Sequence, residues 1–182
     1  MKDKFVQAHM KAAKIYADLS YAKRKKVGAV IVRDDRILSI GYNGTPSGWD
    51  NSCEDSVLWH KGKQLLSPML VTKPEVLHAE TNAIAKLAAS TESGKGATLF
   101  IYPCSPCMEC AKLIYQSGID EVYFTEIYQN EDGLNFLKKA GVKVSQITIQ
   151  YASANRINDD AGINLLRQWQ LHQNAVNVCV CI

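Results

Sequence analysis

Two short motifs in this 182-residue chain contain residues that can bind a metal ion and move a proton. The first contains His78 and Glu80, and the second contains Cys107 and Cys110, directly after Pro106. One histidine and two cysteines are typical zinc ligands, and three protein ligands leave tetrahedral Zn²⁺ one open position where a water becomes acidic. Glu80 adds the carboxylate that carries protons in such a reaction. We therefore predict a catalytic zinc site with His78, Cys107 and Cys110 as ligands.

Both motifs stand at the start of segments with helical spacing. The first turn of a helix has unpaired backbone N–H groups and the positive end of the helix dipole, and both favour a thiolate. Cys107 and Cys110 are three residues apart, so they share one helix face and can bind a single ion. Glu80 follows His78 by two residues and points off that face. We expect Glu80 to approach the water without binding the metal.

Cys104 leaves two other kinds of site open. As a fourth ligand it would close the coordination shell, giving a structural zinc in a non-catalytic binding module. Alternatively, Cys104, Cys107 and Cys110 could begin an iron–sulfur ligand run, but the fourth cysteine with its following proline is absent. We expect Cys104 to be a small buried residue at the end of a strand.

Composition favours one enzyme domain with a small ligand. Lys and Arg total 21 against 18 Asp and Glu, a formal charge of +3, which is too small for a surface that coats nucleic acid. The N-terminus has no apolar leader, and no stretch approaches the ~18 apolar residues of a membrane span, so we expect a cytoplasmic protein without membrane contact. Clustered cysteines indicate reduced metal ligands rather than disulfides.

Helical and strand patterns alternate along the chain. They predict helices at 3–19, 79–89, 107–116 and 131–140, and strands at 27–32, 37–42, 97–102, 121–125 and 142–150. This order predicts the α/β class, as a three-layer α/β/α sandwich with a central mixed five-stranded sheet. We expect residues 1–182 to form a single domain, with 152–182 as a C-terminal helical extension.

Local features refine this arrangement. The first helix has an apolar stripe at helical spacing and a basic face opposite; the stripe consists of Phe5, Ala8, Ala12, Ile15, Tyr16 and Leu19. Asp34 and Asp35 predict a hairpin turn between the first two strands. Gly118 and Gly141 fall where helices end. Residues 43–77 show no period, and a connection this long is usually functional or mobile.

With these residues in place, the chain resembles the zinc-dependent nucleobase deaminases. Within that superfamily it is most similar to deoxycytidylate (dCMP) deaminases. The similarity rests on four segments and covers about residues 23–144; the segments are 27–32, 41–48, 78–84 and 105–112. The resemblance implies a cytidine deaminase-like fold and hydrolysis of dCMP to dUMP and ammonia, which supplies dUMP for thymidylate synthesis.

The resemblance also implies roles for individual residues. Glu80 would move a proton from the attacking water to N3 of cytosine and then to the leaving amine. A backbone carbonyl near Ser105 would accept a hydrogen bond from the exocyclic amine. Asn43 would contact the sugar, although an Asn before Gly is also a common turn residue. Arg24 would bind the phosphate, because a planar guanidinium suits a phosphate monoester, unless it belongs only to a solvated basic face.

Deaminases of this type are commonly hexamers that dCTP activates and dTTP inhibits. Gly44, Pro46 and Gly48 resemble part of their effector loop, where Mg²⁺ could accompany a bound triphosphate. Only Cys53 and His60 offer further ligands in the long connection, so we expect no second zinc. Deaminases of adenosine in transfer RNA, or of free cytosine or cytidine, remain alternatives. The former would need a more basic surface, and the latter would not need Arg24.

Overall fold

The computed structural model describes residues 1–58, 60–61, 64–65 and 68–151. Four helices and nine strands occur in this part of the chain. The helices are α1 (Asp3–Asp18), α2 (Ala79–Ala88), α3 (Met108–Gln116) and α4 (Asp132–Lys139). The strands are β1 (Gly28–Arg33), β2 (Arg36–Tyr42), β3 (Glu54–Val57), β4 (His60–Lys61), β5 (Gln64–Leu65), β6 (Met69–Thr72), β7 (Thr98–Cys104), β8 (Glu121–Glu126) and β9 (Lys143–Gln146). None of these helices has the length and apolar character needed to cross a membrane.

Five strands form one mixed sheet in the order β2-β1-β7-β8-β9. The neighbours β2, β1 and β7 are antiparallel, whereas β7, β8 and β9 run parallel. A helix connects each parallel pair, as such crossovers require. The predicted mixed five-stranded sheet is therefore confirmed.

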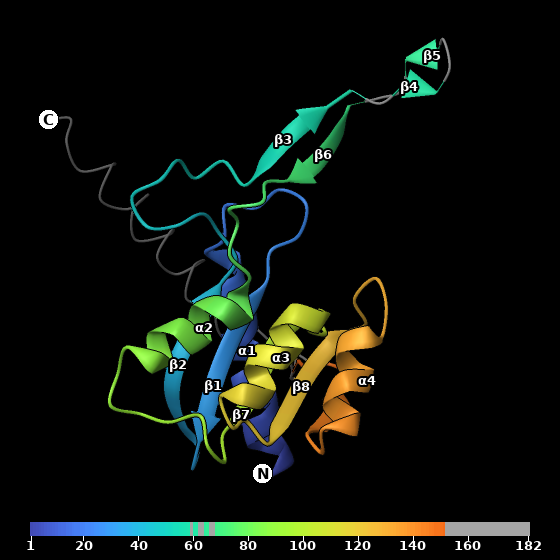
Figure 1. Cartoon of the computed structure of the whole chain (residues 1–182). Helices are drawn as coiled ribbons and strands as arrows, with labels where there is room; N and C mark the ends of the chain where they lie inside the picture. The colour runs from blue at the N-terminus through green and yellow to red at the C-terminus, as the bar shows by residue number, and fades with distance from the viewer. Residues whose placement is uncertain (59, 62–63, 66–67, 152–182) are drawn as a thin grey trace, which may run out of the picture. The chain divides into compact units, whose positions relative to one another are not determined.

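Helices cover both faces of the sheet, and strand β1 shows how (Figure 1). Because side chains alternate along a strand, Ala29 and Ile31 enter a core with α2, α3 and α4. Val30 and Val32 enter a second core, which α1 covers. These two cores confirm the predicted three-layer α/β/α sandwich.

The predicted elements agree with the structure except at three places. In α1, the buried apolar residues are Val6, Met10, Ala13 and Ala17, so the predicted stripe is displaced: Ala12 and Tyr16 pack against this core, but Ile15 is 65% exposed and Leu19 is 53% exposed. The strand expected over 142–150 ends at Gln146. The isoleucines at 147 and 149 nevertheless pack on the α1 core, which explains their apolar pattern.

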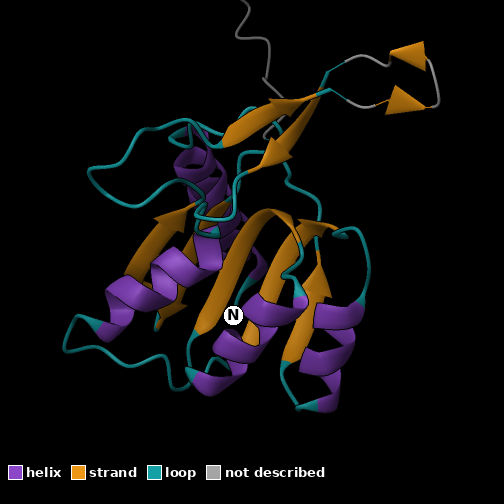
Figure 2. Cartoon of the chain, turned by 45° about the horizontal axis from the view of Figure 1, so that its top comes forward, coloured by secondary structure: helices purple, strands orange, loops and turns teal. Residues whose placement is uncertain are grey.

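The third difference lies in the segment 43–77, which has no sequence period. Here β3 and β6 pair antiparallel into a two-stranded ribbon, with Glu54 opposite Thr72 at one end and Val57 opposite Met69 at the other. Figure 2 shows this ribbon separate from the five-stranded sheet. Most of its residues are exposed, so they need no alternation of apolar and polar side chains.

The hairpin and helix ends follow the predictions. Asp34 and Asp35 have φ of 53° and 58°, as a two-residue hairpin turn requires. Gly118 and Gly141 follow α3 and α4 with positive φ. Residues Met1–Ile149 form one compact unit. The helical extension expected over 152–182 lies outside the described residues, and the assignment of all 182 residues to one domain stays a prediction.

Candidate active site

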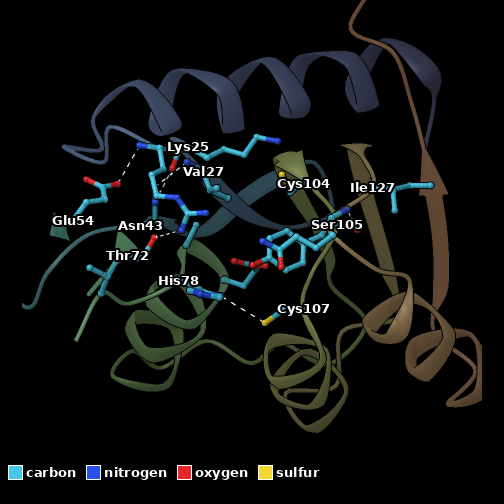
Figure 3. Close-up of a pocket in the computed structure, with 16 residues that line it drawn as sticks. Lys25, Val27, Asn43, Glu54, Thr72, His78, Cys104, Ser105, Cys107 and Ile127 are labelled. Atoms are coloured by element: carbon cyan, nitrogen blue, oxygen red, sulfur yellow. Dashed lines mark hydrogen bonds between the residues drawn. The ribbon is translucent and has the colours of Figure 1, made fainter. Parts of the chain in front are cut away.

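Two helix starts bring the three candidate ligands together. His78 is the N-cap residue of α2, and Cys107 is the N-cap residue of α3, with Cys110 in the first turn of α3. His78 Nδ1 lies 3.3 Å from Cys110 Sγ and 3.6 Å from Cys107 Sγ. The ligand atoms of all three residues lie within 4.8 Å of one another. Figure 3 shows His78 facing Cys107.

These distances fit a tetrahedral zinc ion. With Zn–N of about 2.0 Å and Zn–S of about 2.3 Å, two ligands of a tetrahedron lie about 3.5 Å apart for a nitrogen and a sulfur. The two nitrogen–sulfur distances, 3.3 and 3.6 Å, agree with this value. The donor set and its spacing therefore fit Zn²⁺. In the described part of the chain, the ligand cluster contains His78, Cys107 and Cys110, without Cys104.

The electrostatics of the cluster favour one thiolate. Hydrogen bonds with Cys110 and His78 lower the pKa of Cys107 to about 3. The hydrogen bond with Cys107, together with burial, raises the pKa of Cys110. The Cys107 thiolate also raises the pKa of His78. Because zinc binds deprotonated ligands, loading the site must release the proton that Cys110 holds.

Glu80 is a buried carboxyl group beside the cluster. It lies in the first turn of α2, is only 4% exposed and lines the same cavity as His78 and Cys107. Burial raises its pKa, against the opposing effects of its own backbone N–H and of His78. A carboxyl group with a raised pKa can both accept and donate a proton near neutral pH.

The cavity next to the cluster has a volume of about 290 Å³. Its wall comes from the segment before β1, the ends of β2, β3 and β6, the start of α2, and the residues after β7 and β8. The lining residues are Arg24, Lys25, Val27, Asn43, Glu54, Thr72, Val76, His78, Ala79, Glu80, Cys104, Ser105, Cys107, Ile127, Tyr128 and Gln129. Every predicted metal, catalytic and substrate residue lines it except Cys110, which is buried in the first turn of α3.

Asn43 and Arg24 both line the cavity. The Asn43 side chain accepts a hydrogen bond from Val27 N–H at 2.8 Å and donates one to the Lys25 carbonyl at 2.9 Å. Asn43 therefore fixes the backbone before β1, and its amide retains one N–H and one lone pair for a ligand. Arg24 donates from Nη1 to Thr72 Oγ1 at 2.9 Å.

Ser105 and Cys104 form part of the opposite wall. The Ser105 hydroxyl accepts a hydrogen bond from Tyr128 N–H at 2.8 Å, and Ser105 N–H donates to the Glu126 carbonyl at 2.8 Å. These two bonds hold the Ser105 backbone firmly at the cavity. Cys104 is 5% exposed, and burial raises the pKa of its thiol; among the described residues it lies outside the cluster of candidate ligand atoms.

The predicted effector residues lie outside the cavity wall. Gly44 pairs with Leu77 through two backbone hydrogen bonds, which bring the two ends of the long connection together. The Pro46 carbonyl accepts from Trp49 N–H, and Gly48 has a φ of +85°. Gly44, Pro46 and Gly48 belong neither to the metal-ligand cluster nor to the cavity wall, so the geometry of this site assigns them no function.

Several cavity residues were not predicted from the sequence. Glu54 and Thr72 belong to the ribbon, and Ile127, Tyr128 and Gln129 follow β8. Neither the ribbon residues nor the residues after β8 belong to a recognisable sequence motif. The one available signal was position, because residues after a parallel strand lie at the edge where ligands bind.

The solved structures include a close match to this arrangement. The chain resembles a dCMP deaminase from the cyanophage S-TIM5, whose structure contains dCMP and dUMP, with a TM-score of 0.70 and 40% identity. The match covers 81% of this chain and 99% of that one.

Curated relatives agree with this match. The chain is 37% identical over 161 residues to the deoxycytidylate deaminase of Homo sapiens, which covers 80% of this chain and 85% of the human one. It is 35% identical over 147 residues to the deoxycytidylate deaminase of Saccharomyces cerevisiae. That match covers 76% of this chain but spans only 43% of the yeast protein.

A family model locates the shared region within the chain. The model of the cytidine and deoxycytidylate deaminase zinc-binding region matches residues 3–126. This range contains α1, both metal-binding motifs and the strands β1, β2, β7 and β8. With its three ligand atoms at tetrahedral spacing and a buried carboxyl group beside them, the chain belongs to the cytidine and deoxycytidylate deaminase family.

Proposed function

We propose that this protein hydrolyses dCMP to dUMP and ammonia. The observation that carries this proposal is one cavity that joins a zinc-type ligand cluster, the buried Glu80 carboxyl group and the cationic side chain of Arg24. The first two supply hydrolytic chemistry, and the third supplies a partner for a phosphate. Relatives named deoxycytidylate deaminase at 33–40% identity support the choice of base and phosphate.

Glu80 would accept and donate the protons that the reaction transfers. When bound by His78, Cys107 and Cys110, Zn²⁺ supplies a Lewis acid that makes a water acidic enough to attack C4 of cytosine. Glu80 accepts a proton from that water and delivers it to N3 of the ring. It then takes the second proton of the former water from the new C4 hydroxyl and transfers it to the amine, so that the C4–N bond breaks, ammonia leaves and the C4 carbonyl forms. Burial assists, because the raised pKa of Glu80 suits both steps.

The cavity walls would hold the two ends of the nucleotide. The carbonyl oxygen of Ser105 accepts a hydrogen bond from the exocyclic amine, with its backbone fixed by the bonds to Tyr128 and Glu126. The remaining N–H and lone pair of the Asn43 amide contact the deoxyribose. Arg24 binds the phosphate from the same wall as Asn43.

A substrate panel tests this assignment. Zinc-loaded protein is assayed for ammonia release with dCMP, deoxycytidine, cytosine and an RNA stem-loop containing adenosine. We expect dCMP to react fastest. Turnover of the RNA alone, or of none of the four by folded zinc-bound protein, would contradict the proposal.

Arg24→Ala tests the phosphate contact. We expect the variant to lower kcat/KM for dCMP by about 10- to 100-fold, the range for a lost hydrogen bond between charged groups, and to leave turnover of deoxycytidine unchanged. Lys26→Ala is the matched control, since Lys26 is a nearby cation that bonds the Asp18 carbonyl and does not line the cavity. An equal loss on both substrates would remove the phosphate role of Arg24.

We further propose the assembly and regulation that the resemblance to deoxycytidylate deaminases implies. The protein would be a hexamer that dCTP activates and dTTP inhibits, with Mg²⁺ bound to the triphosphate. The loop of Gly44, Pro46 and Gly48 would bind the effector, because a Cβ atom added at either glycine would meet nothing within 4 Å, which leaves space for a ligand beside the loop. Since dCMP belongs to the nucleotide pool inside the cell, we place the reaction in the cytoplasm. Kinetics with each triphosphate, and sedimentation of the protein, test these points.

A further inference from the structure

We propose that Glu54 and Thr72, at the base of the β3–β6 ribbon, position Arg24 and thereby set the preference for a nucleotide over a nucleoside. This inference rests on the proposed function, in which Arg24 binds the substrate phosphate. Neither residue belongs to a metal-binding motif, and both line the cavity. Figure 3 shows Glu54 and Thr72 on the same side of the pocket as Asn43 and Lys25.

Glu54 holds the backbone that carries Arg24. Its Oε1 accepts hydrogen bonds from Lys23 N–H at 3.0 Å and from Arg24 N–H at 3.1 Å, and its Oε2 lies 3.1 Å from Lys23 N. The residues between α1 and β1 belong to no helix or strand, so the Glu54 carboxylate supplies hydrogen bonds that regular secondary structure does not give their N–H groups. Bonds to a carboxylate are stronger than neutral ones. Glu54 therefore defines where the Arg24 side chain begins.

Thr72 holds the other end of the arginine. Its hydroxyl oxygen accepts the 2.9 Å hydrogen bond from Arg24 Nη1. Glu54 and Thr72 are direct partners in the β3–β6 register, so one pair of ribbon residues fixes both the backbone and the guanidinium group of Arg24. The Thr72 hydroxyl also retains its own proton, which it can donate to a phosphate oxygen.

The arrangement lowers the cost of binding an anion. Arginine is rich in rotamers, and a guanidinium group that is already oriented loses less entropy when phosphate binds. A free carboxylate near this site would instead repel phosphate. The Glu54 oxygens, however, face the two backbone N–H groups, so their charge orders the segment. The expected consequence is a lower KM for the phosphorylated substrate.

Steady-state kinetics of the zinc-loaded protein with dCMP and with deoxycytidine test the proposal. We expect Glu54→Ala to raise KM for dCMP by about 10-fold, with little change in kcat and none in the deoxycytidine reaction. Thr72→Val should act in the same direction, whereas Thr72→Ser should retain the wild-type KM because it keeps the hydroxyl. Asp55→Ala is the matched control, an exposed neighbour that pairs with Lys73 and is absent from the cavity wall.

A double-mutant cycle separates positioning from a general loss of structure. If Glu54 acts through Arg24, Glu54→Ala will have no further effect in an Arg24→Ala background. Additive losses in the double variant would overturn the proposal. So would an unchanged KM for dCMP in Glu54→Ala, or an equal loss with deoxycytidine.

Calorimetry distinguishes failure of this inference from failure of the proposed reaction. Wild-type protein and Glu54→Ala are titrated with dUMP and with deoxyuridine. A dUMP affinity about 10-fold weaker in the variant, with deoxyuridine unaffected, would support positioning even if dCMP were not turned over. An unchanged dUMP affinity would overturn it, whatever the activity of the wild type.

Discussion

Glu80 has its unusual environment because of where it stands in helix α2. His78 is the N-cap residue, so it lies at the edge of the helix, where its ring faces the two cysteines. Glu80 lies within the first turn and is almost fully buried. Two residues of separation therefore place a ligand and a proton carrier around the same position without making both bind the metal. The cost of burying this carboxyl group raises its pKa, as proton transfer at this position requires.

Glu80→Gln tests this separation of roles. The amide keeps the size of the side chain but cannot accept and return a proton, so we expect kcat for dCMP to fall by about 10²- to 10⁴-fold. Metal analysis should still find one zinc per chain. Glu109→Gln is the control, because this glutamate lies in the first turn of α3 and pairs with Lys112 at the surface. Loss of zinc from the Glu80 variant would show that the carboxylate is a ligand.

The residues of the metal site were predictable because each motif is recognisable within a few residues, although His78 lies 29 residues before Cys107. Cys107 and Cys110 share a helix face, and Pro106 marks the helix start, so spacing alone brings their sulfurs together. The partners of Arg24 were not predictable in this way. Glu54 and Thr72 lie 30 and 48 residues away along the chain, in a segment without periodicity, and only the fold brings them to the cavity.

Helix α4 supports the metal site without contributing a ligand. Gly133, in its first turn, lies against the turn that leads into α3. A Cβ atom at this position would lie 2.2 Å from the Pro106 carbonyl oxygen and 2.9 Å from that of Cys107. Backbone atoms cannot rotate away as a side chain could. The absence of a side chain at Gly133 therefore permits the position of Cys107.

Gly133→Ala should disturb zinc binding from outside the ligand set. The added methyl group must push α4 away from the Cys107 turn, and overpacking of this kind costs about 1–3 kcal/mol in the free energy of unfolding. We expect weaker zinc affinity, measured by competition with a chelator, and a lower unfolding midpoint. Asn135→Ala, on the exposed side of α4, is the control. Zinc affinity equal to that of the wild type would mean that the turn adjusts freely.

The elements differed in how well the sequence predicted them. Strands β1 and β7 are mostly buried and rich in β-branched or aromatic residues, so their patterns were clear. The ribbon strands β3 and β6 are mostly exposed, and exposure removes the alternation on which prediction depends. In α1, the buried apolar residues are Val6, Met10, Ala13 and Ala17, and the larger Ile15 and Leu19 remain exposed, so residue size was a misleading guide.

At the scale of the whole molecule, the five-stranded sheet lies between the metal site and the hydrophobic core that α1 covers. The helices that carry the metal site, α2 and α3, cover one face, whereas α1 covers the other, where its Met10 and His9 pack near Phe100 of β7. His9 is 8% exposed, and its ring centroid lies 5.3 Å from that of Phe100. Its Nε2 is buried and has no hydrogen-bond partner in the described part of the chain. A neutral imidazole tolerates this position, but a charged one would be penalised.

His9 should therefore make stability depend on pH from the face opposite the metal site. Burial lowers its pKa from the ordinary 6.5, although the Asp35 carboxylate opposes this effect. The unfolded chain then binds the proton more tightly than the folded one, so stability is complete above about pH 6.5 and falls as the pH drops below it. His9→Leu removes this contribution. Urea unfolding of the metal-free proteins at pH 7.5 and 5.5 measures the difference. We expect the free energy of unfolding of the variant to fall less between these values than that of the wild type, with His78 titrating equally in both. Parallel losses would show that His9 accommodates its charge in the folded protein.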